Sequence, residues 1–218
     1  PICVELETML RGICEKKTFL DLLENFILYD HSGGRTTKIL ARNHQYLGVN
    51  EAVSAYENRK LKDGRLGVFW HTQGSGKSYS MVFLAQKIRR KFAGSPTIVV
   101  LTDRDELNRQ ISDTFENCGL LGKTKASQFI ASSGTDLVKK LQGNPSFVFT
   151  LIQKFNLPKE PPIYPDHDIL ILSDEAHRSQ YGIFADNMMH LLPTASRIGF
   201  TGTPLLARSE ERRVGKEC

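Results

Sequence analysis

The segment with the most specific chemistry is His71-Thr-Gln-Gly-Ser-Gly-Lys-Ser78, which lies between an apolar run and a helical pattern. Its glycines would let the backbone wrap closely around phosphate groups, with N–H groups pointing inward. Lys77 would place a positive charge beside the β- and γ-phosphates, and the Ser78 hydroxyl could ligate Mg²⁺. The strict pattern begins with glycine where this chain has His71, so a plain glycine turn before a helix is the alternative. We predict an ATP-binding phosphate loop formed by Gly74, Ser75, Gly76, Lys77 and Ser78.

Two adjacent carboxylates, Asp174 and Glu175, directly follow the apolar run at 168–173. This position predicts that both lie at the carboxyl end of a strand, where α/β proteins bind ligands. Asp174 would hold Mg²⁺, directly or through water, and Glu175 would orient and deprotonate the attacking water. The acidic first turn of a helix is the alternative. Thr201-Gly-Thr203 follows the next apolar run, and its two hydroxyls are placed to sense the γ-phosphate.

Short apolar runs alternate with helical patterns and would position these groups. Strands are predicted at 66–70, 97–102, 147–151, 168–173 and 197–201. Helices are predicted at 5–29, 38–56, 77–92, 105–115 and 136–141. This alternation predicts an α/β fold of three layers with a mostly parallel sheet, preceded by a helical segment. The basic run 87–91, at the end of one predicted helix, is interpreted as a solvated face.

Composition excludes several classes of protein. The chain has 218 residues, 29 Lys and Arg against 24 Asp and Glu, and 40% hydrophobic residues, which is ordinary for a globular protein. No apolar run approaches the roughly 18 residues that a membrane span needs. The four cysteines have no CxxC spacing, so neither a zinc site nor a disulfide framework is predicted, and a cytoplasmic location is expected. The net charge of +5 permits a polyanionic partner.

Both ends of the sequence are unusual. It begins at Pro1 without a signal segment, which predicts a start inside a longer protein. Residues 208–218 are polar and without periodicity, and they resemble the translation of a sequencing-adapter oligonucleotide. We predict that 208–218 is a non-native tail that packs on nothing; a native charged tail is the alternative.

The phosphate loop, the Asp-Glu-Ala-His box at 174–177 and Thr-Gly-Thr-Pro at 201–204 occur in the order of the first motor domain of superfamily 2 helicases and translocases, which the chain resembles. More closely, it resembles the motor (R) subunit of type I restriction enzymes. The phrases that carry this resemblance lie at 38–46, 67–78, 98–107, 149–155 and 172–182.

The resemblance implies a RecA-like motor domain over 34–207 and, over 1–33, a helical connector from a nuclease domain. Gln45 would contact adenine, for which its amide can both donate and accept hydrogen bonds; a solvent-facing helical glutamine is the alternative. Residues that would contact DNA are Thr102, Arg104, Thr150, Gln153 and Lys154, with polar loop caps as the alternative. Residues that would couple the nucleotide to motion are His177, Thr201, Gly202 and Thr203.

The implied function is ATP- and Mg²⁺-dependent translocation on double-stranded DNA within a type I restriction endonuclease, without a membrane. Its partners would be methyltransferase and specificity subunits. Hydrolysis would require arginines from a second motor domain, whose motifs are absent from this chain. The alternatives are another superfamily 2 DNA or RNA helicase, a P-loop kinase or transferase, and a nucleotide-binding module that does not hydrolyse. A kinase predicts a substrate lid and no Thr-Gly-Thr-Pro motif.

Overall fold

The computed structural model describes residues 7, 10, 12–70, 72, 74–157, 160–164, 167–174, 181–202 and 213–214. A parallel sheet with the strand order β5-β4-β6-β7-β3-β8 forms its centre. The strands are β3 (Arg65–Trp70), β4 (Thr97–Thr102), β5 (Phe147–Leu151), β6 (Ile169–Asp174), β7 (Ser196–Thr201) and the two-residue β8 (Arg213–Val214). The predicted mostly parallel sheet is therefore confirmed.

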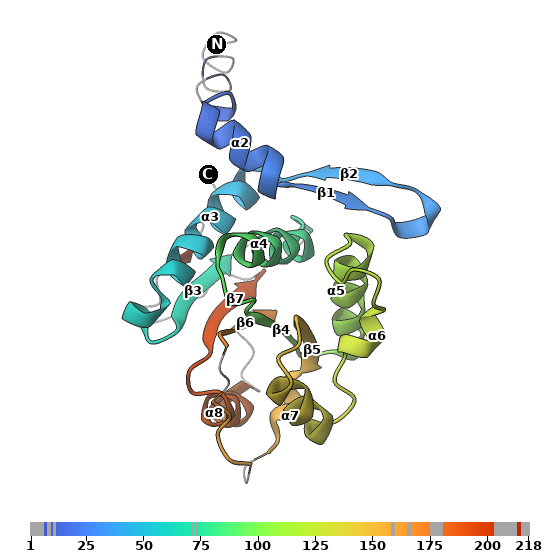
Figure 1. Cartoon of the computed structure of the whole chain (residues 1–218), viewed down its shortest axis with the longest axis vertical. Coiled ribbons are helices and arrows are strands. Elements are labelled where there is room, and N and C mark those ends of the chain that lie inside the picture. The colour runs from blue at the N-terminus through green and yellow to red at the C-terminus, as the bar shows by residue number, and fades with distance from the viewer. Residues whose placement is uncertain are drawn as a thin grey trace.

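Helices cover both faces of the sheet and give the three predicted layers (Figure 1). One face packs against α3 (Asn43–Glu57), α4 (Lys77–Lys91), α5 (Asp105–Asn117) and the short α6 (Ala126–Phe129). The other face packs against α7 (Gly134–Gln142), α8 (Tyr181–Leu191) and the 3-10 turn η3 (Ile152–Phe155). All six residues of β4 are buried, as expected for a strand covered on both faces.

The N-terminal region departs from the sequence prediction. The helix predicted over 5–29 is wrong beyond Asn25, where α2 (Lys16–Asn25) ends. Strands β1 (Ile27–Asp30) and β2 (Thr37–Leu40) follow as an antiparallel hairpin, and α3 begins only at Asn43. Gly33 and Gly34 form the turn with φ angles of 63° and 72°, values that favour glycine. The predicted domain boundary between residues 33 and 34 lies inside this hairpin, and residues 27–30 of the predicted helical connector form a strand. The division into a connector and a motor domain stays a prediction.

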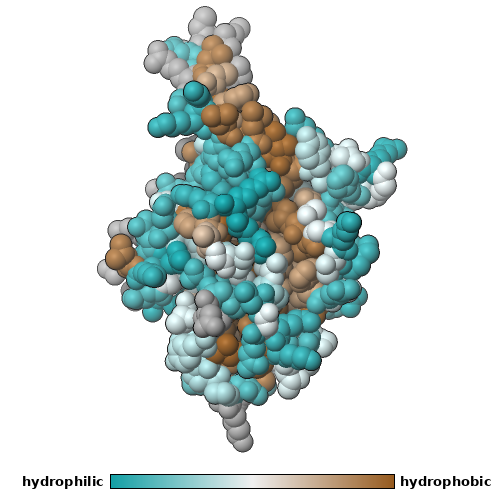
Figure 2. Space-filling view, viewed as in Figure 1, coloured by the Kyte–Doolittle hydropathy of each residue, from teal (hydrophilic) through white to brown (hydrophobic). Residues whose placement is uncertain are grey.

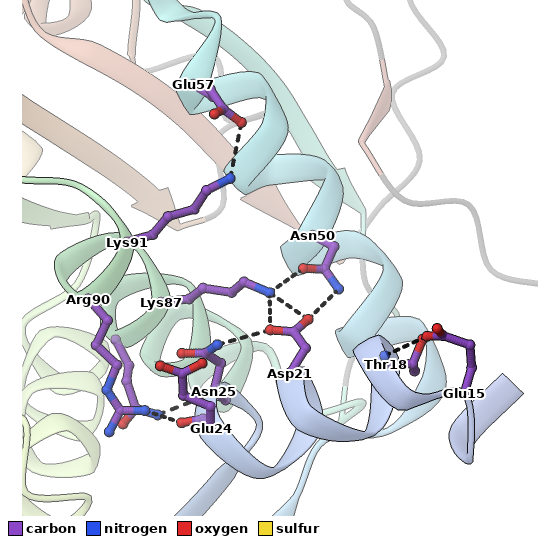
Figure 3. Close-up of polar contacts among 11 residues, drawn as sticks. Glu15, Thr18, Asp21, Glu24, Asn25, Asn50, Glu57, Lys87, Arg90 and Lys91 are labelled. Carbon is purple, nitrogen blue, oxygen red and sulfur yellow. Dashed lines mark hydrogen bonds and ion pairs between the residues drawn. The ribbon is translucent and has the colours of Figure 1, made fainter.

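A largely buried ion pair joins α2 to α4, and a hydrogen bond to an amide on α3 adds to it (Figure 3). Lys87 Nζ on α4 lies 2.5 Å from Asp21 Oδ1 on α2 and 2.6 Å from Asn50 Oδ1 on α3. Only 10% of the Lys87 side chain is exposed. The ammonium also lies 4.8 Å from the centre of the Phe26 ring. Lys87 thus anchors α2, and its interpretation as a solvated residue is wrong.

The rest of the basic run contacts three further parts of the chain. Arg89 donates to the Ser146 carbonyl at 3.3 Å, and its guanidinium lies 5.1 Å from the centre of the Phe147 ring. Arg90 donates to the Glu24 carbonyl, and Lys91 Nζ lies 3.1 Å from Glu57 Oε2 (Figure 3). The C-terminal end of α4 is therefore a structural junction.

Helix α2 carries exposed apolar side chains, and Figure 2 shows hydrophobic residues continuing along this helix. Phe19, Leu20 and Leu23 are 47%, 54% and 50% exposed. Within the described residues, no helix is long and apolar enough to cross a membrane.

The C-terminal segment 208–218 also differs from its prediction. Arg213 and Val214 pair with Val68 and Phe69 at the edge of the sheet, so the expectation that 208–218 packs on nothing is wrong for these two residues. The non-native origin of the tail stays a prediction.

Candidate nucleotide-binding site

The phosphate loop connects β3 to α4, as the sequence predicted. Gly76 is the N-cap of α4 with a φ of +90°, and Gly74 has a φ of +80°; both values favour glycine. Ser75 closes the loop, because its hydroxyl donates to the Thr72 carbonyl at 2.5 Å and its backbone N–H donates to the same carbonyl at 3.1 Å. His71 and Gln73 lie outside the described residues. Because the first N–H groups of a helix have no acceptor within it, this loop presents donors suited to an anion.

The tip of β6 reaches the start of α4. Asp174 ends β6 and is 5% exposed, and its Oδ1 lies 3.2 Å from Lys77 Nζ. The predicted proximity of these two side chains is therefore confirmed. The order β6-β7-β3 explains it, because only one strand separates β6 from the strand that leads into the loop. The Asp174 carboxylate and the hydroxyl of Ser78, the residue after Lys77, are oxygen ligands of the kind Mg²⁺ prefers, while the lysine and the loop N–H groups suit phosphates.

Part of the predicted site lies outside the described residues, namely Glu175, His177 and Thr203. Thr201 ends β7, where it is 1% exposed and pairs with Trp70, the last residue of β3. Asp174 pairs with Phe200 on the same strand. The register thus brings Thr201 and Gly202 to the same edge of the sheet as the phosphate loop and Asp174.

Gln45 is buried beneath the loop, with 3% of its surface exposed, so the solvent-facing alternative is wrong. Its amide nitrogen donates to the Gly76 carbonyl and to the Ser80 hydroxyl, both at 3.1 Å. Its Oε1 accepts a hydrogen bond from the Arg42 backbone N–H at 2.9 Å. These contacts occupy both donors of the amide, so in this structure Gln45 supports the loop. A contact with adenine stays a prediction.

The five residues predicted to contact DNA lie at the carboxyl ends of β4 and β5, but in different environments. The Thr102 and Thr150 side chains are buried, and their hydroxyls donate to the carbonyls of Arg104 and Leu151. Lys154 donates to the Ala131 carbonyl. Arg104 is exposed, and Gln153 is exposed while donating to the Asp103 carbonyl at 3.0 Å. Arg104 and Gln153 are therefore the two side chains best placed to reach a ligand.

Sequence reasoning missed two residues that bear on the loop. Ser80 is fully buried and accepts from Gln45, and Tyr79 donates to Asp30 on the hairpin at 2.5 Å. A signal for Ser80 was available, because a serine four residues after Gly76 lies on the same face of the helix. The Tyr79 contact spans 49 residues, and no local pattern indicates it.

Similarity to known proteins identifies the family to which this site belongs. The family model described as SWI2/SNF2 ATPase matches residues 44–216. The chain belongs to the SWI2/SNF2 ATPase family. The residues matched to this family include the phosphate loop, the tip of β6 and Thr201, so the observed site lies within its ATPase domain.

This SWI2/SNF2 ATPase domain is similar to endonuclease subunits of type I restriction enzymes. It is 40% identical to the HindI endonuclease subunit of Haemophilus influenzae over 92% of the chain and 21% of that protein. It is 35% identical to the putative MjaIXP endonuclease subunit of Methanocaldococcus jannaschii over 92% of the chain and 19% of that protein. The chain thus spans about a fifth of these relatives.

Solved structures share the fold of this SWI2/SNF2 domain. The UvsW helicase from bacteriophage T4 matches 87% of the chain and 60% of its own length, with a TM-score of 0.58 and 18% identity. The ATP-dependent type ISP restriction-modification enzyme LlaBIII, bound to DNA, matches 80% of the chain and 13% of its own length, with a TM-score of 0.54 and 15% identity. The fold is that of RecA-like helicase domains.

Proposed function

We propose that this chain is the first motor domain of the ATP-dependent, DNA-translocating subunit of a type I restriction endonuclease. The single observation that carries the nucleotide site is the 3.2 Å contact between Lys77 on the phosphate loop and Asp174 at the tip of β6. The 40% identity to a type I endonuclease subunit supports the choice of system. In the cell, such a subunit would work in the cytoplasm with methyltransferase and specificity subunits.

The residues of the proposed site would have separate roles at the nucleotide, according to their charge and position. Lys77 would neutralise the β- and γ-phosphates, while the loop from Gly74 to Ser78 would donate backbone N–H groups to them. Ser78 and Asp174 would hold Mg²⁺, which neutralises charge on the phosphates when bound. Glu175 would orient the attacking water and accept its proton.

Coupling to DNA would use the same edge of the sheet. His177, Thr201, Gly202 and Thr203 would transmit the state of the γ-phosphate. Arg104 and Gln153 would meet the phosphate backbone of double-stranded DNA, and Thr102, Thr150 and Lys154 would hold these loops in shape through their carbonyl contacts. The net charge of +5 supports a polyanionic partner.

Hydrolysis by this chain alone is expected to be slow. In the family that the sequence resembles, arginines from a second motor domain stabilise the transition state. Such arginines are worth about 10³- to 10⁵-fold in rate. We therefore expect Mg·ATP binding, little turnover and little stimulation by DNA.

Isothermal titration with Mg·ATP tests the proposed site. The unaltered chain should bind, and Lys77→Ala should lose about tenfold or more in affinity, because a charge beside the phosphates is removed. Lys91→Ala is the matched control, since Lys91 lies on the same helix and pairs with Glu57 at the surface. Equal affinity in the unaltered chain and in Lys77→Ala would contradict the site. Rapid, DNA-stimulated turnover by the chain alone would contradict the need for a second domain.

A further inference from the structure

One buried carboxylate links the β1–β2 hairpin to the first turn of α4. Asp30, the last residue of β1, is 6% exposed. Its Oδ2 accepts a hydrogen bond from the Tyr79 hydroxyl at 2.5 Å, and its Oδ1 accepts one from the Ser32 backbone N–H at 2.8 Å. Both carboxylate oxygens are therefore engaged, one by α4 and one by the hairpin turn.

The protonation states of this pair favour a strong contact. Burial by itself raises the pKa of Asp30, but hydrogen bonds from Tyr79 and Ser32 outweigh it and hold that pKa below its ordinary value. A hydrogen bond from a phenol to an ionised carboxylate is charge-assisted, and such hydrogen bonds are stronger than neutral ones.

The hairpin end of this contact is fixed to the body of the domain. The His31 backbone N–H donates to the Asn117 carbonyl at the end of α5, at 3.1 Å. At the base of the hairpin, the Ala41 N–H donates to the Phe26 carbonyl at 3.0 Å. A two-stranded hairpin alone is marginally stable, so these contacts give Asp30 a defined position. Figure 1 shows the hairpin extending past α4 toward α5.

The other end of the contact lies beside the phosphate loop. Tyr79 directly follows Ser78 and is the third residue of α4. The first intrahelical bond runs from the Ser80 N–H to the Gly76 carbonyl at 3.1 Å, so the turn that contains Tyr79 carries the N–H groups available to an anion. Fixing the Tyr79 side chain therefore restrains the turn that would receive phosphates.

We propose that Asp30 and Tyr79 are a pair of positioning residues that hold the first turn of α4 ready for the phosphates of the nucleotide. This inference rests on the proposed ATP site and deepens it. Neither side chain needs to touch the ligand, because the apparent affinity falls in proportion to the fraction of molecules in the binding-competent conformation. If that fraction falls to about one tenth when the contact is lost, the Kd rises about tenfold.

Tyr79→Phe and Asp30→Asn test the pair, because the first keeps the ring and the second keeps the shape. Titrations with Mg·ATP, Mg·GTP and inorganic tripolyphosphate should show about the same tenfold loss for all three ligands. The double variant should lose no more than either single variant, since both remove one contact. Lys91→Ala should match the unaltered chain. Circular dichroism, with titrations well below each melting temperature, separates binding from unfolding.

The possible results of these titrations lead to different conclusions about Asp30 and Tyr79. Unchanged phosphate affinity in folded variants would overturn the proposal, even if their melting temperatures fell, because the contact would then be structural only. Additive losses would overturn the coupling of the pair. A loss for ATP that is absent for tripolyphosphate would instead place Tyr79 against the nucleoside. If the unaltered chain and Lys77→Ala bind Mg·ATP equally, the proposed function fails first and this inference falls with it.

Discussion

Breaking the Lys87–Asp21 pair should destabilise the domain far more than breaking a surface pair on the same helix. In Lys87→Met, the Asp21 carboxylate loses the ammonium at 2.5 Å and keeps amide contacts with Asn25 and Asn50. Removing one partner of a fully buried pair costs about 3–5 kcal/mol. The two side chains are 10% and 23% exposed and the amides remain, so we expect about 2–3 kcal/mol. For a protein of this size, that lowers Tm by roughly 4–12 °C.

The assay is a double-mutant cycle by urea and thermal unfolding, followed by circular dichroism. Asp21→Leu should cost a similar amount, whereas the double variant with Lys87→Met should lie within about 1 kcal/mol of the unaltered chain, because no buried charge is left alone. Lys91 and Glu57 provide the matched control, since they join α4 to α3 while 45% and 55% exposed. Their coupling should be at most about 1 kcal/mol.

The pH dependence gives a second check on the Lys87–Asp21 pair. Burial raises the pKa of Asp21, but hydrogen bonds from Lys87 and Asn25 outweigh it, so the folded-state pKa is lowered. The contribution of Asp21 to the free energy of unfolding is therefore fully present above its unfolded-state pKa of about 4. It is lost as pH falls from there through the lowered folded-state pKa. Asp21→Leu should remove that part of the acid sensitivity. If Lys87→Met costs no more than Lys91→Met, the buried pair does not hold α2 to α4.

Two further predictions concern the loop and the cysteines. Gly76→Ala should reduce stability and Mg·ATP affinity more than Gly74→Ala: both positions have positive φ, but only at Gly76 would the new Cβ lie 3.0 Å from Gln45 Nε2. Equal effects in unfolding and titration experiments would contradict this. Burial raises the pKa of the Cys118 thiol to about 12, so iodoacetamide at pH 8 should modify exposed Cys14 and spare Cys118 until urea is added. Peptide mass spectrometry checks this, and equal labelling of the folded chain would refute it.

Local patterns predicted the elements that carry the nucleotide site, because each depends on neighbours in the sequence. Apolar runs marked the five long strands, and the glycines with Lys77 marked the loop before α4. The hairpin was missed because Phe19, Leu22, Leu23, Phe26 and Ile27 continue a helical period that gave no reason to stop at Asn25. Short apolar runs on either side of Gly33-Gly34 were the available signal for it.

Long-range partners could not be predicted from local pattern. The basic run 87–91 is consistent with a solvated face until α2, α3 and β5 are placed against it. Gln45 acts on the phosphate loop from 31 residues away, and that separation carries no period. Strand order likewise could not be predicted from local pattern, because β3 pairs with β7, a strand that lies far along the chain from it.

Pulsed electron paramagnetic resonance with Mn²⁺ in place of Mg²⁺ tests most directly whether Lys77, Ser78 and Asp174 form one metal–nucleotide site. With ATP present, the chain should bind one tight Mn²⁺ whose spectrum shows coupling to phosphorus. Asp174→Asn should weaken that metal binding about tenfold or more, because it removes an ionised oxygen ligand. The control Lys91→Ala should leave it intact. Tight Mn²⁺ binding without phosphorus coupling, or an unchanged spectrum and affinity in Asp174→Asn, would contradict a shared site at the phosphate loop and the tip of β6.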